Sequence, residues 1–272
     1  MTRRTHVAID IGASSGRHVL GWLENGKICL REMYRFENGA DLKNGHLYWD
    51  HARLEREIVN GLRACREAGE CPETVGIDTW GVDYALLDAS GALTGDTAAY
   101  RDSRTAGIPD TLDDDALYAV TGIQRQPFNT LYQLLADKRD RPESLEKAER
   151  LLFMPEYLAY VLSGRMENEY TIASTSGLLD AQKRDWAWAL IDSLGLPRRL
   201  FGPLRQPGFS LGRVRPEIAR EIGFAPEVIL PPAHDTAAAV LGAPLEAGDA
   251  FLSSGTWSLL GAEIDAPVLT RD

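Results

Sequence analysis

The residues best suited to chemistry begin near the amino terminus. An apolar segment, Val7–Ile11, carries one carboxylate, Asp10, and then breaks into a turn of small residues. Small side chains leave the backbone N–H groups of such a turn uncovered, and the arginine that follows can fork to an anion. The candidate phosphate-binding residues are Ala13, Ser14, Ser15, Gly16 and Arg17.

This turn predicts a polyphosphate-binding site, with Asp10 placed to hold a hydrated magnesium ion. The alternative is a β-hairpin whose glycines, Gly12 and Gly16, serve only the turn. The stretch is neither a Walker A loop nor a dinucleotide fingerprint, because no Gly-Lys-Ser/Thr follows and no helix opens after it.

A second candidate lies far downstream, where the apolar segment Val228–Ala233 runs into His234, Asp235 and Thr236. Asp235 is the candidate catalytic base, because a carboxylate at a strand end can take a proton from a substrate hydroxyl. The alternative for Asp235 is a helix N-cap for the short helix expected over 237–241. His234 alone is more typical of a structural histidine, but beside Asp235 it becomes a candidate ligand for a sugar hydroxyl.

The stretch Asp78–Asp83 interrupts two apolar segments with polar groups and one indole, Trp80. Sugar sites combine an aromatic face with carboxylates, and Gly81 allows close backbone approach. A tryptophan buried at a strand crossing explains the pattern equally well. For Arg101–Arg104, surface ion pairing is the favoured interpretation.

The composition restricts the possible partners. The 272 residues carry a net charge of −11 without a basic stripe, which argues against nucleic acid and anionic membranes. Three cysteines without a Cys-x-x-Cys pair favour reduced thiols, and the histidines lack ligand spacing. Without a signal core or a membrane-length apolar run, a soluble cytoplasmic protein is expected.

The elements that must position these residues predict an α/β fold. Three strands meander through the first 36 residues with an Asn25-Gly26 hairpin turn, a helix covers 50–68, and a strand broken at 79–81 covers 74–87. This order fits a mixed sheet. Segments 38–45, 171–177 and 203–216 are expected to be loops. The turn at 253–256, after another apolar strand, repeats the opening pattern, which suggests a duplicated fold that holds one phosphate group from both sides.

Taken in order, these segments resemble the FGGY carbohydrate kinases of the actin-like ATPase superfamily. The matching stretches are Asp10–Arg17, Gly76–Asp83, Tyr100–Arg104, Phe128–Leu134, His234–Thr236 and Ser253–Ser258. The resemblance implies a ribonuclease H-like N-terminal sugar-binding domain over 1–243 and the start of a C-terminal ATP-binding domain over 244–272.

The resemblance also implies the reaction and the roles of the residues. ATP with Mg²⁺ would phosphorylate the 1-hydroxyl of a ketose, L-rhamnulose, in sugar breakdown. Asp235 would accept the proton, Thr256 would contact the γ-phosphate, and Gly81 with His234–Thr236 would contact the sugar. Family members continue into a full second domain, so we expect the 272 residues by themselves to have little kinase activity. The alternatives are a kinase for another ketose or a polyol, and a non-catalytic sugar-binding protein of actin-like fold.

Overall fold

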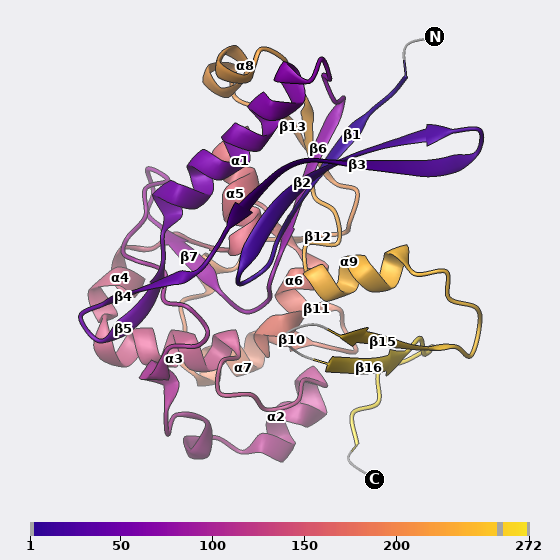
Figure 1. The fold of residues 1–272 in the computed structure, drawn as a ribbon. Helices are drawn as coiled ribbons and strands as arrows, with labels where there is room; N and C mark the ends of the chain where they lie inside the picture. The colour runs from indigo at the N-terminus through magenta and orange to yellow at the C-terminus, as the bar shows by residue number, and fades with distance from the viewer. Residues whose placement is uncertain (1–2, 255–257, 271–272) are drawn as a thin grey trace.

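The central element is a six-stranded mixed sheet, seen in a computed structural model that describes residues 3–254 and 258–270 (Figure 1). Across the sheet its strands are β13 (Ser210–Arg213), β14 (Glu227–Ile229), β6 (Thr74–Thr79), β1 (His6–Ile11), β2 (Ser15–Glu24) and β3 (Lys27–Glu37). The strands β14, β6 and β1 are parallel, whereas β1, β2 and β3 form an antiparallel meander. The predicted α/β fold with a mixed central sheet is therefore confirmed.

The remaining strands pair two by two. They are β4 (Ala40–Lys43) with β5 (His46–Trp49), β7 (Tyr84–Leu87) with β8 (Arg150–Phe153), β9 (Asn168–Glu169) with β12 (Leu204–Arg205), β10 (Leu179–Asp180) with β11 (Asp185–Trp186), and β15 (Ala250–Ser254) with β16 (Ser258–Ala262). The helices are α1 (His51–Glu67), α2 (Asp114–Thr121), α3 (Thr130–Asp140), α4 (Pro142–Lys147), α5 (Met154–Ser163), α6 (Tyr170–Ala173), α7 (Trp188–Ser193), α8 (Pro216–Ile222) and α9 (Asp235–Gly242). Within the described ranges no helix has the length and apolarity that a membrane crossing requires.

The helix α1 shows why the sequence folds locally as predicted. Asp50 caps it by accepting a hydrogen bond from the Arg53 backbone N–H, and the apolar positions spaced three and four apart are buried. Together with α5 and α8, α1 packs on the sheet around the first hydrophobic core. A second core lies between α3, α4, α6, α7 and the β7–β8 pair.

Several segments differ from the prediction. The segment 38–45 contains β4 and the turn into β5, because Asn44 and Gly45 both adopt positive φ in a two-residue hairpin turn. The segment 171–177 is helical, with α6 followed by a 3-10 turn at Ser174–Ser176. The segment 203–216 supplies β12 and the edge strand β13.

Two element boundaries near the predicted sites also differ. The strand predicted over 228–233 ends at Ile229, because two prolines follow at 231 and 232 and cannot donate to a ladder. The helix after it begins at Asp235, and His234 occupies the N-cap position. The alternative of Asp235 as the N-cap is therefore wrong, since Asp235 is the first helical residue.

Candidate functional site at the carboxyl ends of the parallel strands

Candidate residues from distant parts of the chain meet at one edge of the central sheet. In the parallel register of β1 and β6, Asp10 lies opposite Asp78 and Ile11 opposite Thr79. Thr79 in turn bridges to His234, and its N–H donates to the Ala233 carbonyl at 3.0 Å. Ligands of open α/β sheets bind outside the carboxyl ends of parallel strands. Asp10 and Asp235 are thus brought to the edge where a ligand is expected.

Asp78 is a third carboxylate at this edge, and sequence reasoning did not single it out as one of a group. Burial raises its pKa well above the usual value, and the negative charges of Asp10 and Asp235 raise it further. The three acids are therefore close enough to influence one another. The available signal was positional, because Asp10 and Asp78 both stand near the end of an apolar strand.

Asp235 is held at the amino end of α9. Its Oδ1 accepts the Thr236 N–H at 2.6 Å and lies 3.3 Å from His234 Nε2. Its side chain is 39% exposed. Burial lowers the pKa of His234, and the negative charge of Asp235 offsets only part of this lowering. The imidazole is therefore neutral at neutral pH. The exposure of Asp235 leaves the carboxylate within reach of a substrate hydroxyl, as a general base requires.

The turn between β1 and β2 is closed by its own backbone. The Gly12 N–H donates to the Ser15 carbonyl at 2.9 Å, and Asn38, which the sequence placed in a loop, donates its side-chain amide to the Gly12 carbonyl at 2.8 Å. Within the described residues, the N–H groups of Ala13 and Ser14 have no acceptor. The turn therefore presents free donors of the kind that bind phosphate oxygens.

Of the two glycines in this turn, Gly16 has a packing role. Neither Gly12 nor Gly16 has a positive φ. Gly16 belongs to β2, and a Cβ there would overlap the Phe36 ring. Gly16, itself one of the predicted phosphate-binding residues, is thus required for packing of the β2–β3 pair.

Arg17 lies across the β1–β2 ladder from Asp10. Its Nε donates to Asp10 Oδ2 at 3.0 Å, one Nη lies 2.9 Å from the same oxygen, and its side chain is about half exposed. The guanidinium thus both neutralises Asp10 and stands beside the turn. No group of three or more His, Cys, Asp or Glu side chains in the described chain could hold a metal by itself. Magnesium binds through one or two carboxylates, waters and substrate phosphates, so Asp10 fits such an ion when nucleotide is present.

Gly81 lies in a strained turn. The Asp83 N–H donates to the Gly81 carbonyl at 2.9 Å, and Val82 between them has φ 69°. This is the rare γ-turn with positive φ. Thr175, from the helical segment predicted as a loop, accepts the Val82 N–H at 3.0 Å through its hydroxyl. Sequence reasoning missed Thr175, although a run of small hydroxyl residues at 174–176 was available as a signal.

Trp80 does not offer a free face to a sugar. It is only 5% exposed and packs against Trp49, with ring centroids 4.1 Å apart and ring planes tilted by 36°. Both indole N–H groups donate to Asp83 Oδ2, at 2.9 Å from Trp80 and 2.6 Å from Trp49. The alternative of a buried tryptophan is the correct one.

A cavity of about 440 Å³ is lined by residues 100–103, 105–106 and 127–128. Its wall includes Tyr100 and Phe128, whose rings meet edge to face at 5.7 Å, and the 101–106 segment. The Tyr100 N–H donates to Asp83 Oδ2 at 3.0 Å, which links the cavity wall to the Gly81 turn. The cavity is large enough for a small sugar.

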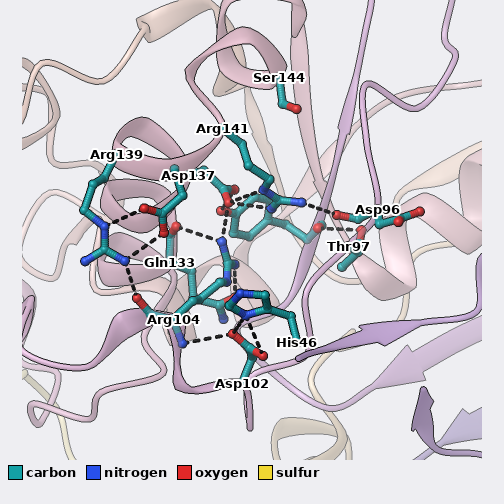
Figure 2. A network of polar contacts seen from close by, with 12 residues as sticks. His46, Asp96, Thr97, Asp102, Arg104, Gln133, Asp137, Arg139, Arg141 and Ser144 are labelled. Carbon is teal, nitrogen blue, oxygen red and sulfur yellow. Dashed lines mark hydrogen bonds and ion pairs between the residues drawn. The ribbon is translucent and has the colours of Figure 1, made fainter. Parts of the chain in front are cut away.

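The Arg101–Arg104 segment is only partly a surface cluster. Arg101 is exposed beside Tyr100, but Arg104 is buried and pairs with the buried Asp137 (Figure 2). The interpretation of surface ion pairing is therefore wrong for Arg104. Thr256, the predicted γ-phosphate contact, lies outside the described residues, between β15 and β16.

Known proteins of one family are similar to this chain. The model of the FGGY family of carbohydrate kinases, N-terminal domain, matches residues 5–242. Rhamnulokinase of Oceanobacillus iheyensis is 41% identical over 98% of this chain and 58% of its own length, and rhamnulokinase of Halalkalibacterium halodurans is 45% identical over 96% and 57%. A carbohydrate kinase structure from Novosphingobium aromaticivorans superposes with TM-score 0.80 at 25% identity, over 99% of this chain and 58% of that one. The chain spans a little over half the length of these relatives. It belongs to the FGGY family of carbohydrate kinases.

Proposed function

We propose that this chain is the sugar-binding and base-bearing part of an ATP-dependent ketose kinase that phosphorylates the 1-hydroxyl of L-rhamnulose. The single observation that carries the proposal is the meeting of Asp10, Asp78 and the His234–Thr236 segment at the carboxyl ends of parallel strands. The choice of L-rhamnulose rests on the relatives, which are rhamnulokinases at 41–45% identity. The proposed domains are 1–243 for the sugar and 244–272 for the start of the ATP-binding domain.

Asp235 is the proposed base. Its Oδ1 is engaged by Thr236, so Oδ2 is the atom that would take the proton from the sugar 1-hydroxyl. As that proton leaves, the hydroxyl oxygen forms a bond to the γ-phosphorus, and the bond from phosphorus to the ADP oxygen breaks. His234 and Thr236 would hold neighbouring hydroxyls of the sugar, and the neutral imidazole suits a hydrogen bond to a hydroxyl.

The phosphates of ATP would lie against the first turn. The free N–H groups of Ala13 and Ser14, with Ser15, Gly16 and Arg17, are the proposed contacts. Asp10 would hold magnesium through its water shell, and the ion would offset charge on the phosphates. Thr256, which lies outside the described residues, is the proposed contact to the γ-phosphate.

The sugar would lie between Gly81 and the His234–Thr236 segment. The Tyr100–Phe128 wall of the neighbouring cavity would offer apolar contact to the sugar carbons. Catalysis in this arrangement comes mainly from positioning and charge neutralisation, as is general for phosphoryl transfer from nucleotides.

The test uses a full-length kinase that contains this chain. Asp235→Asn keeps the side-chain volume but removes the base. We expect the rate of ATP consumption with L-rhamnulose to fall by about 10²–10⁴-fold. Calorimetry should show ketose affinity within about threefold of wild type, because an amide retains hydrogen bonding to a hydroxyl.

Asp113→Asn is the matched control. Asp113 caps α2 by accepting the N–H groups of Asp115 and Ala116, and asparagine caps equally well. Its rate should equal wild type. An unchanged rate in Asp235→Asn would refute the base assignment. A panel of ketoses and polyols in the same assay decides the substrate, and a faster reaction with another sugar would refute the choice of L-rhamnulose.

A further inference from the structure

The backbone of the Gly81 turn adopts a conformation that its sequence does not favour. Val82 has φ 69°, although β-branched residues avoid positive φ more than most others do. Gly81 itself is crowded, since a Cβ there would lie 3.1 Å from the Thr175 side chain. Strain of this kind persists only where the surroundings impose it, and it concentrates at ligand sites.

Hydrogen bonds from three sides impose this geometry. Thr175 takes the Val82 N–H, and the Thr130 hydroxyl donates to the Val82 carbonyl at 2.7 Å. Asp83 closes the turn on Gly81. Both polar groups of the strained peptide are therefore satisfied by helical segments distant in sequence.

Asp83 connects this turn to the neighbouring segments through hydrogen bonds. It is 0% exposed and accepts from four separate segments. Trp49, Trp80 and the Tyr100 backbone donate to Oδ2, and Gln133 Nε2 donates to Oδ1 at 2.9 Å. One carboxylate thus holds the turn, the cavity wall, β5 and α3 together.

Gln133 connects this buried carboxylate to a buried cation. Its Oε1 accepts from Arg104 Nη2 at 2.8 Å while its Nε2 faces Asp83. Figure 2 shows Arg104 beside Gln133 and Asp137. The orientation of the Gln133 amide is therefore determined at both ends.

We propose that Asp83 is a positioning residue for the ketose, which fixes the Gly81 turn and the Tyr100 wall in one geometry and so determines which ketose is accepted. This inference rests on the proposed function, because it takes Gly81 as a sugar contact. Asp83 does not touch the substrate. It acts through the backbone of Gly81, Val82 and Tyr100.

Asp83→Asn in the full-length kinase tests the proposal. The asparagine N–H₂ group is a donor, and it must face either Gln133 Nε2 or the three groups that donate to Oδ2, which are also donors. Residue 83 therefore loses at least one hydrogen bond. We expect the KM for L-rhamnulose to rise by about 10–100-fold. The KM for ATP should stay within about twofold, and the ratio of kcat/KM between L-rhamnulose and other ketoses should fall by about tenfold.

Leu62→Ala is the control for a purely structural effect. Leu62 is fully buried on the inner face of α1, so this variant lowers the melting temperature without reaching the turn. It should leave the KM for ketose and the ketose preference unchanged. If Asp83→Asn lowers the melting temperature like Leu62→Ala but keeps wild-type ketose KM and preference, the proposal is overturned.

Thr130→Val decides the matter if Asp83→Asn does not fold. It removes only the hydroxyl that donates to the Val82 carbonyl, and we expect the KM for ketose to rise by about threefold to tenfold with the KM for ATP unchanged. Unchanged ketose kinetics in this variant would overturn the proposal. A wild-type kinase that prefers another ketose refutes only the assigned substrate. The effect of Asp83→Asn is then measured as the KM for that ketose. A wild type that phosphorylates no ketose refutes both proposals.

Discussion

His18 should make the stability of this protein depend strongly on pH below neutrality. Its ring is 0% exposed under α1, with Nε2 3.1 Å from the Ile58 carbonyl and the Tyr34 ring edge to face at 5.7 Å. The other ring nitrogen, Nδ1, is buried and has no partner within the described residues. Burial lowers the pKa of His18 from 6.5 to about 4, and the bond to Ile58 offsets only part of this.

Proton linkage determines how the free energy of unfolding changes with pH. Between pH 6.5 and about 4 the unfolded chain binds a proton at residue 18 and the folded chain does not. The free energy of unfolding is therefore highest above pH 6.5 and falls as the pH drops toward 4. At about 1.4 kcal/mol per pH unit, the full loss from this residue is on the order of 3 kcal/mol. His51, whose pKa is also lowered to about 4 by burial, adds a loss of the same sign.

The assay is urea unfolding at pH 7.5 and pH 4.5 for wild type and His18→Gln. Glutamine can keep a donor toward the Ile58 carbonyl but does not titrate. We expect wild type to lose about 2–3 kcal/mol more between the two pH values than the variant does. Equal losses would show that His18 is protonated in the folded state and would refute the reasoning.

Two further predictions concern packing and buried charge. Gly61→Ala on α1 should lower the free energy of unfolding in urea by about 1–3 kcal/mol, because the added methyl group would overlap the His18 ring. Alanine normally favours a helix, so a gain in stability would contradict this packing. Asp137→Asn should cost about 3–5 kcal/mol, because it leaves the buried Arg104 without its counter-charge. Asp140→Asn, an exposed neighbour paired with Arg139, is its control and should change stability by under about 1 kcal/mol. Equal effects in these two aspartate variants would refute the buried pair.

Local patterns in the sequence determined the elements and the family. Alternating apolar residues and the Asn25-Gly26 pair specified the β1–β3 meander, and both turn residues adopt the positive φ that such a turn needs. The Asp50 cap and a 3.6-residue apolar period specified α1. These signals act between near neighbours, so they are visible without the fold. The order of six motifs was sufficient to predict the FGGY family, which the comparisons confirm.

Only the tertiary structure decided which of these residues meet. The parallel register of β1 and β6 places Asp78 beside Asp10. Contact with Trp49 buries Trp80, and the Trp49 indole donates to Asp83, which thereby connects separate segments. Arg104 became an interior cation because Asp137, 33 residues away, lies against it. Such partners are joined by long-range packing, and a side chain's type does not reveal its partner. The sequence therefore determined which groups could do chemistry, and the packing of the sheet determined their neighbours and their charge.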